Sequence, residues 1–186
     1  MAKGNVGNLL QHFVAIRAAH QLFAAHGDVR AETTYVDCHS MAPWEPIQRR
    51  GPKYPDFIHA LASARAPSDP VAAAFQAAWQ VYPEDLPANP VARLYPNTAV
   101  LLAAGLPHVR WSMRLHDIEP SPRDLLETWG RQRPWPVAVH GDWNRSPLVR
   151  KCQATGPTLV MLDPYKVTVG KPKSSGDLRV DDLRLI

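Results

Sequence analysis

Cysteines and long apolar runs are both scarce in this sequence of 186 residues. The two cysteines, Cys38 and Cys152, are too few for a disulfide framework or a four-cysteine zinc site, and we interpret them as reduced thiols. No apolar run approaches the ~18 residues of a membrane-spanning helix. The segment that starts at Met1 also lacks the charged, apolar and small-residue pattern of a secretory signal peptide. These absences predict a cytoplasmic protein with no membrane partner.

Charge of either sign is not in large excess, because 21 Lys and Arg residues against 17 Asp and Glu residues leave a net charge of +4. This mild basic balance permits a phosphate-bearing partner without requiring one. Proline is abundant instead, with 19 residues, or about 10% of the chain, against a usual ~5%. That content excludes an all-helical bundle and predicts many turns. The length suits one domain with a substantial core.

Hydrophobic periodicity predicts helices that alternate with strands. Helices are expected over 5–26 and 98–105, and another begins with Ser121 as its N-cap and Pro122 as its first residue. The expected strands are 33–38, 109–116, 135–140 and 158–163. The proline-rich segment 43–95 is interpreted as a helical insertion or lid, with short helical pieces at 57–64 and 71–81. The alternation predicts an α/β fold with a mostly parallel sheet.

Carboxylates and histidines follow the predicted strands at the points where those strands end. The acidic residues are Asp37, Asp117, Asp142 and Asp163, and they are accompanied by His39, His116, His140 and Gly141. An Asp after a single strand is often only a turn residue or a helix cap. Four of them at one sheet edge, where open parallel sheets bind their ligands, favour a shared binding site.

The order of these motifs resembles that of the bacterial adenine-N6 methyltransferases that act on 23S ribosomal RNA. Gly4-Asn5 with Leu10 and His12 resembles the opening helix of that family, and Asp37-Cys38-His39 resembles the end of its first strand. Further similar stretches follow in the same order: Tyr95-Pro96-Asn97-Thr98, Asp117-Ile118-Glu119-Pro120-Ser121, His140-Gly141-Asp142-Trp143 and Asp163-Pro164-Tyr165. The resemblance extends from residue 4 to residue 165.

The resemblance implies a Rossmann-like class I methyltransferase sheet with helices on both faces, in a single domain over 1–186. Its cofactor would be S-adenosyl-L-methionine (SAM), and no metal ion is expected. The implied cofactor-binding residues are Asn5, His12, Asp37, His39, Thr98, Asp117, His140, Gly141 and Asp142. Among them, Asp117 would accept the ribose hydroxyls, and Asp142 or the His140-Gly141 backbone would meet the adenine amine. His12, His39 and Thr98 would flank the methionine end.

The implied catalytic residues are Asp163, Pro164 and Tyr165. In the resembled family, Asp163 and a carbonyl after it would accept hydrogen bonds from the target amine, and Tyr165 would stack on the base. The methyl acceptor would be a nucleobase amine in RNA, with DNA less favoured, or a small molecule. Only 23 residues follow Asp163, fewer than three further strands need, so the C-terminal strands are expected to be missing or shortened. The sheet edge left free would favour a homo-oligomer.

Two alternatives remain open. A non-catalytic methyltransferase-like binding or complex partner is favoured by Ser40-Met41-Ala42-Pro43, which replaces the family's glycine-rich turn, and by the short segment after Asp163. A metal-dependent phosphohydrolase is the less favoured alternative. Asp37 and His39 in an Asp-x-His pattern, with Gly141-Asp142-Trp143-Asn144-Arg145, supply residue types that a two-metal site uses.

Overall fold

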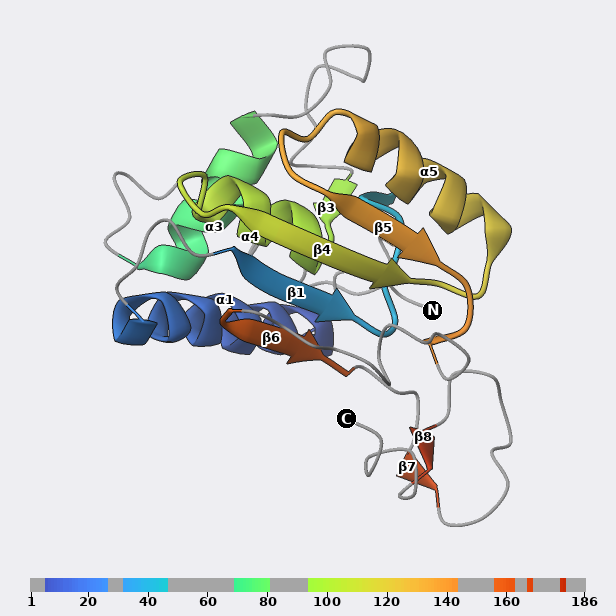
Figure 1. Cartoon of the computed structure of the whole chain (residues 1–186), viewed down its shortest axis with the longest axis horizontal. Coiled ribbons are helices and arrows are strands. Elements are labelled where there is room, and N and C mark those ends of the chain that lie inside the picture. Colours follow the sequence, from blue (N-terminus) through green and yellow to red (C-terminus); the bar gives the residue numbers. More distant parts are fainter. Residues whose placement is uncertain are drawn as a thin grey trace. The chain divides into compact units, whose positions relative to one another are not determined.

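The structure is a computed structural model that describes residues 6–26, 32–46, 69–80, 94–143, 156–162, 167–168 and 178–179. Its helices are α1 (Val6–His26), α3 (Pro70–Gln80), α4 (Thr98–Gly105) and α5 (Pro120–Arg131). Its strands are β1 (Thr33–Asp37), β2 (Trp44–Pro46), β3 (Leu94–Pro96), β4 (Trp111–His116), β5 (Val137–His140), β6 (Thr158–Met161), β7 (Val167–Thr168) and β8 (Leu178–Arg179), all drawn in Figure 1.

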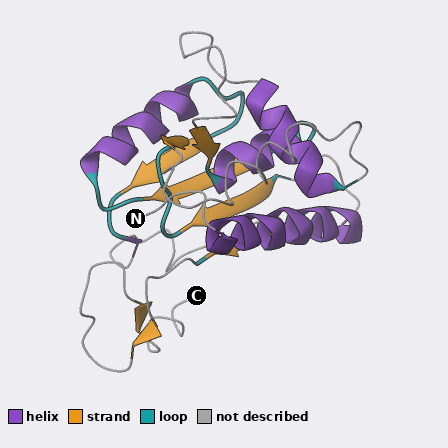
Figure 2. Cartoon of the chain, turned by 180° about the vertical axis from the view of Figure 1, so that it is seen from behind, coloured by secondary structure: helices purple, strands orange, loops and turns teal. Residues whose placement is uncertain are grey.

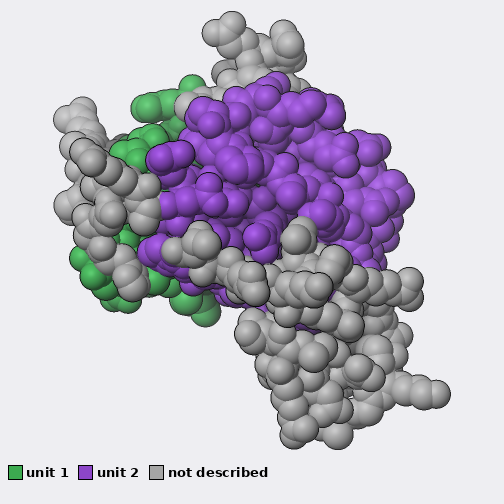
Figure 3. Space-filling model, viewed as in Figure 1, with its two compact units in different colours: residues 1–30, 43–109 green, residues 31–42, 110–186 purple. Residues whose placement is uncertain are grey.

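The chain divides into two compact units, which are coloured separately in Figure 3. The helical unit comprises residues 1–30 and 43–109, and the sheet unit comprises residues 31–42 and 110–186. The segment 43–95, predicted as an insertion, therefore shares a unit with the first helix and with α4. None of the helices in the described ranges is both long enough and apolar enough to cross a membrane.

The described part of the helical unit contains mutually packed helices and a short antiparallel ribbon. Helix α3 packs against α4, α1 contacts both helices, and β2 pairs with β3. Helix α4 is buried on nearly every side from Thr98 to Ala103, as its apolar sequence requires. It begins after Asn97, whose side-chain oxygen accepts a hydrogen bond from the Val100 N–H at 2.9 Å.

An aromatic cluster joins the elements of the helical unit. Its members are His12 on α1, Phe75 and Trp79 on α3, and Tyr95 on β3. The Phe75 ring centroid lies 5.3 Å from that of Trp79 and 5.7 Å from that of Tyr95. The Trp79 indole N–H also donates to the Leu94 carbonyl at 3.3 Å. The cluster therefore ties α3 to the strand that precedes α4.

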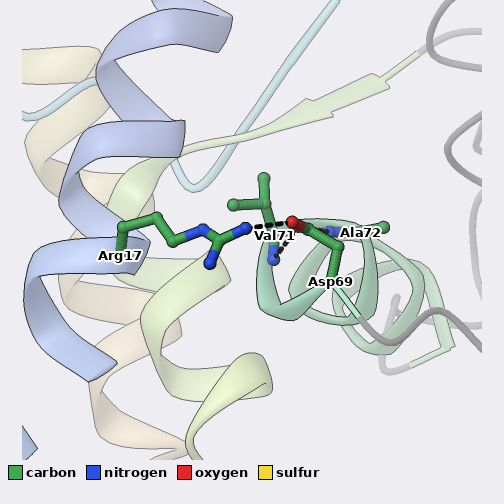
Figure 4. A network of polar contacts seen from close by, with 4 residues as sticks. All are labelled: Arg17, Asp69, Val71 and Ala72. Atoms are coloured by element: carbon green, nitrogen blue, oxygen red, sulfur yellow. Dashed lines mark hydrogen bonds and ion pairs between the residues drawn. The ribbon is translucent and has the colours of Figure 1, made fainter. Parts of the chain in front are cut away.

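Helix α3 is capped and attached to α1 by one carboxylate. Asp69 accepts hydrogen bonds from the backbone N–H groups of Val71 at 2.8 Å and Ala72 at 3.3 Å, and it forms an ion pair with Arg17 (Figure 4). Although desolvation opposes the shift, these backbone bonds and the guanidinium hold the pKa of Asp69 below its usual value. Because Asp69 and Arg17 are both partly exposed, we expect the capping to stabilise α3 more than the ion pair does.

Helices α3 and α4 approach each other closely at Gly105. A Cβ atom added there would lie 2.6 Å from the Cβ of Ala74 and 3.2 Å from its Cα. We predict that Gly105→Ala lowers the free energy of unfolding by about 1–3 kcal/mol through overpacking. In an Ala74→Gly background the same change should cost less, because the 2.6 Å contact with the Ala74 Cβ is removed and only the 3.2 Å contact with the Cα remains. Urea unfolding of the four chains tests this, and an equal cost in both backgrounds would contradict it.

The sheet unit is built on four parallel strands in the order β5-β4-β1-β6. In the register of these strands, Asp37 lies opposite Leu115 on one side and Met161 on the other, and His116 lies opposite His140. Helix α5 packs on β5, with Leu126 and Trp129 buried and Gly130 placed against Val137. Figures 1 and 2 show the strands with their arrowheads toward one edge and α5 beside β5.

The predicted α/β fold with a parallel sheet is confirmed. The expected helix 5–26 corresponds to α1, the piece 71–81 to α3, and the helix 98–105 to α4, while the four expected strands correspond to β1, β4, β5 and β6. The other expected helical piece, 57–64, lies outside the described residues. The β2–β3 ribbon was not predicted, because each strand is only three residues long and includes a proline.

One predicted helix start is wrong. Helix α5 begins at Pro120 after the N-cap Glu119, and not with Ser121 as the N-cap. The reason is local, because the Asp117 carboxylate accepts the Glu119 N–H at 2.8 Å and turns the chain two residues earlier. Pro120 then occupies the first helical position, where its missing N–H costs no hydrogen bond.

Candidate functional site

Four parallel strands bring separate parts of the sequence to one edge of the sheet unit. We call this the carboxyl edge, and its described residues are Asp37–Ser40, His116–Asp117 and His140–Trp143. Of the four strands of this sheet, the first three in chain order are β1, β4 and β5, and they lie side by side. The fourth, β6, pairs with the opposite side of β1. Strand order therefore reverses between β1 and β6, the kind of position where open α/β sheets bind ligands.

Asp37 is the buried carboxylate of this edge. One of its oxygens accepts a hydrogen bond from the Tyr35 hydroxyl at 2.9 Å, and the other accepts the His39 backbone N–H at 3.1 Å. Tyr35 lies two residues earlier on β1, so the strand itself places both groups on the same face. The carboxylate is thus held in one orientation at the end of the strand.

Asp117 lies just beyond β4, the neighbour of β1. Its carboxylate accepts the Glu119 N–H at 2.8 Å, which orients it at the start of α5. Its own backbone N–H donates to the His140 carbonyl at 3.1 Å and so ties the ends of β4 and β5 together. Asp37 and Asp117 therefore lie at the ends of adjacent strands, as the sequence predicted.

His116 and His140 form a pair of imidazoles on these two strands. They are direct register partners, with ring centroids 5.4 Å apart and planes inclined by 31°. The Nδ1 atom of His116 lies 3.1 Å from the Asp37 carbonyl oxygen, so this nitrogen carries the proton and Nε2 is left as an acceptor. The Nε2 atoms of both rings are buried and have no hydrogen-bond partner among the described residues.

Both imidazoles of this pair are neutral at pH 7. Burial lowers the pKa of His116 to about 4, while its hydrogen bond to Asp37 acts in the opposite direction. Burial also lowers the pKa of His140, and the guanidinium of Arg114 adds to that shift. Because both rings are neutral, each has a nitrogen lone pair and neither brings a positive charge to the carboxyl edge.

The end of β5 and the turn after it contain three predicted cofactor residues, His140, Gly141 and Asp142, and Trp143 follows them. A Cβ at Gly141 would lie 2.9 Å from Nη1 of Arg123, which shows that the guanidinium on α5 reaches this turn. Trp143 is buried, and its ring centroid lies 6.0 Å from that of His39. It packs in an apolar cluster whose other members are Val36, Cys38, Val160 and Leu162. Trp143 thus anchors the turn in the core.

The loop after β1 is hydrogen-bonded to both neighbouring strands. The Cys38 N–H donates to the Met161 carbonyl at 3.0 Å, and the Ser40 N–H donates to the His116 carbonyl at 2.7 Å. Burial, with a smaller effect from Asp37, raises the pKa of the Cys38 thiol to about 12, so the sulfur is protonated and unreactive at neutral pH. Ser40 is also buried, and its hydroxyl has no hydrogen-bond partner within the described ranges.

Two predicted cofactor residues belong to the helical unit. His12 is stacked on Tyr95, with 5.1 Å between ring centroids, and its Nδ1 lies 2.8 Å from the Tyr95 hydroxyl oxygen. Burial lowers the pKa of His12 to about 3, so it is neutral. Thr98 is the buried first residue of α4. Inside their own unit both residues have structural contacts, and their role toward a cofactor stays a prediction.

The remaining predicted site residues lie outside the described ranges. These are Asn5, Asp163, Pro164 and Tyr165. The structure brings together Asp37, His39, Asp117, His140, Gly141 and Asp142 at the carboxyl edge. Within the described ranges, no group of three His, Cys, Asp or Glu side chains is arranged to hold a metal ion.

Sequence reasoning did not assign a role to three residues of this edge. His116 was recognised as the end of a strand, but only its register with His140 shows that the two rings are neighbours. Ser40 was noted only as part of the segment that replaces the family's glycine-rich turn, and its burial gives no signal in the sequence. Arg123 belongs to the helix that was predicted to begin at Ser121 and Pro122. The closeness of its guanidinium to Gly141 depends on tertiary structure.

Comparison with known proteins supports the fold and gives no family. No family model matches the sequence, and no curated protein matches it. Among solved structures, protein LPL1258 from Legionella pneumophila, assigned to the DUF519 family, is similar with a TM-score of 0.60 at 16% sequence identity. The match covers 88% of this chain but only 58% of that protein's chain. At this identity the likeness shows a shared α/β fold alone.

Proposed function

We propose that this chain binds SAM at the carboxyl edge of its sheet unit and transfers the methyl group to a nucleobase amine, with RNA favoured over DNA. The observation that carries the proposal is the convergence of Asp37, Asp117 and the His140–Asp142 turn at the ends of three adjacent parallel strands. These are residues that the motif resemblance assigns to the cofactor, although they lie far apart in the sequence. The net charge of +4 permits a nucleic-acid partner but does not select RNA over DNA.

The side chains of this edge fit the nucleoside part of SAM. A nucleoside offers hydroxyl and amine donors, and the edge offers the acceptors Asp37, Asp117 and Nε2 of His116, which has no hydrogen-bond partner among the described residues. SAM, when bound, supplies a methyl group on a positively charged sulfur. A buried carboxylate such as Asp37 near that charge is electrostatically favourable.

The residues of the chain would act mainly by positioning. Asp117, already oriented by the Glu119 N–H, would hold the ribose hydroxyls. Asp163, Pro164 and Tyr165 would hold the target amine in line with the methyl group. They lie outside the described residues, but they follow β6, which pairs with β1 next to the point where strand order reverses. Holding two reactants in line is itself a large catalytic effect, and the amine needs no strong base.

We predict that S-adenosylhomocysteine binds the full chain with a micromolar dissociation constant. Asp117→Ala should weaken this affinity by about 10- to 150-fold, because hydrogen bonds to a charged group contribute about 1.5–3 kcal/mol. Titration calorimetry measures both values. Asp124→Ala is the matched control, because Asp124 is an exposed carboxylate within α5 that does not follow a strand. It should leave the affinity unchanged.

The outcomes separate the proposed function from its alternatives. Methyl transfer from SAM to an RNA oligonucleotide would support the enzyme directly. Binding of S-adenosylhomocysteine and RNA without any transfer would instead favour a non-catalytic partner. Hydrolysis of a phosphodiester that requires Mn²⁺ or Zn²⁺ would favour the phosphohydrolase. Failure of S-adenosylhomocysteine to bind the wild-type chain would remove the proposal.

A further inference from the structure

The imidazole pair of His116 and His140 has two distal ring nitrogens whose hydrogen-bond partners the described part of the chain does not supply. His116 is fully buried, and its Nδ1 proton is already used in the bond to the Asp37 carbonyl. Its Nε2 and that of His140 are buried without a partner in the described ranges, although such atoms are nearly always hydrogen-bonded in folded proteins. Leaving a buried polar atom without a partner costs stability, so two neighbouring unpartnered ring nitrogens need a reason.

The surroundings of the pair limit what kind of group it would accept. Arg114 lies two positions before His116 on β4, so the two side chains are on the same face of the strand. The charge of Arg114 lowers the pKa of both His116 and His140. A second cation is therefore unfavourable here. An anion would meet the lone pair of His116 Nε2, which is also unfavourable. A neutral N–H or O–H donor is the group that suits these atoms.

The position of the pair selects among the donors of a nucleoside. This step rests on the proposed function, in which Asp117 beyond β4 takes the ribose hydroxyls. The donor that remains is the exocyclic amine of the purine, and His140 immediately precedes the turn at Gly141-Asp142 that would meet that base. We infer that His116 and His140 are specificity-determining residues, which accept hydrogen bonds from a 6-amino purine and reject a 6-oxo purine.

The inference predicts a measurable preference between two ligands. S-Adenosylhomocysteine carries a 6-amino group, whereas its deaminated analogue, S-inosylhomocysteine, carries an oxygen at that position and has no donor there. The wild-type chain is expected to bind the amino compound about 10- to 100-fold more tightly, because the oxo compound would leave the acceptors unpaired and facing another acceptor. Calorimetric titration with both compounds gives this ratio.

Asparagine and glutamine variants form a matched test of the pair. In the double variant His116→Asn/His140→Asn, the short amide that replaces His116 retains a donor near the Nδ1 position, but both distal acceptors are removed. In His116→Gln/His140→Gln, each longer amide can offer an oxygen near the Nε2 position. The preference should fall to about threefold or less in the asparagine double variant and should stay above that in the glutamine variant. Thermal unfolding shows whether both double variants fold.

The result distinguishes this inference from the function on which it rests. If the wild-type chain binds S-adenosylhomocysteine and the asparagine double variant retains the full preference, the imidazole pair does not read the base, and the inference is overturned while the function stands. Equal binding of both compounds by the wild-type chain would also overturn it. If S-adenosylhomocysteine does not bind the wild-type chain at all, the proposed function fails and the inference fails with it.

Discussion

At pH 4 the protein is expected to be about 6 kcal/mol less stable than at pH 7, because two buried histidines must stay neutral in the folded state. Burial lowers the pKa of His12 in the helical unit from 6.5 to about 3. Burial likewise lowers the pKa of His116 in the sheet unit from 6.5 to about 4. Each unit of the chain therefore contains one such group.

The sign of the effect follows from where the protons bind. Below pH 6.5 the unfolded chain takes up a proton at each histidine, whereas the folded chain does not until the pH approaches the lowered pKa. Stability is therefore fully present above pH 6.5 and falls as the pH decreases, by about 1.4 kcal/mol per pH unit for each histidine. Between pH 6.5 and 4 this amounts to about 3 kcal/mol for His12 and about as much for His116, within a total stability of about 5–15 kcal/mol.

Urea unfolding at several pH values between 7 and 4 tests the prediction, and glutamine variants assign the effect. His12→Gln removes the titrating group, so the fall in stability with pH should be shallower by about 1.4 kcal/mol per unit. His20→Gln is the comparison variant. Burial, His108 and Arg17 also lower the pKa of His20, but this ring is only partly buried, so its removal should change the pH dependence less than that of His12. An unchanged pH dependence in His12→Gln would show that His12 is not the titrating group.

The parallel sheet was predictable because its strands have two signals in the sequence, an apolar run and an aspartate near the end of that run. Residues 33–37 and 158–161 are runs rich in β-branched and apolar residues, and an aspartate ends the first run and follows closely after the second. The helix-strand alternation then restricts the topology to a parallel arrangement. The start of α5 was missed because the Asp117 carboxylate accepts the Glu119 N–H and so turns the chain before Ser121. The tendency of aspartate to form such a turn competes with the Ser-Pro signal for a helix start.

The candidate site was predictable in its carboxylates and not in its imidazole pair. Aspartates after strands can be recognised one strand at a time, since each lies at a strand's carboxyl end. The contact between His116 and His140 requires the register between β4 and β5, which no local pattern encodes. The stacking of His12 on Tyr95 joins positions 83 residues apart, so the burial of that ring also depends on tertiary packing.

Phe75→Ala is expected to destabilise the helical unit by about 3–5 kcal/mol. The side chain is fully buried, and its ring lies near those of Trp79, Tyr95 and His12. Its removal loses the transfer free energy of a phenyl group and leaves a cavity among rings that cannot easily move inward. Each aromatic contact contributes about 0.5–1.5 kcal/mol beyond the buried area. A loss of this size would lower the midpoint of thermal unfolding by about 10 °C or more.

Phe13→Ala supplies the matched control, because it removes the same ring from a surface position. Phe13 is 42% exposed on α1 and contacts the Arg17 guanidinium, whose carbon lies 5.3 Å from the ring centroid. We expect this variant to lose about 1 kcal/mol or less, since a partly exposed ring has less buried area to lose than Phe75 and its removal leaves no enclosed cavity. Comparable losses for the two variants in thermal and urea unfolding would mean that the aromatic cluster does not hold α1, α3 and β3 together, and that the core of the helical unit lies elsewhere.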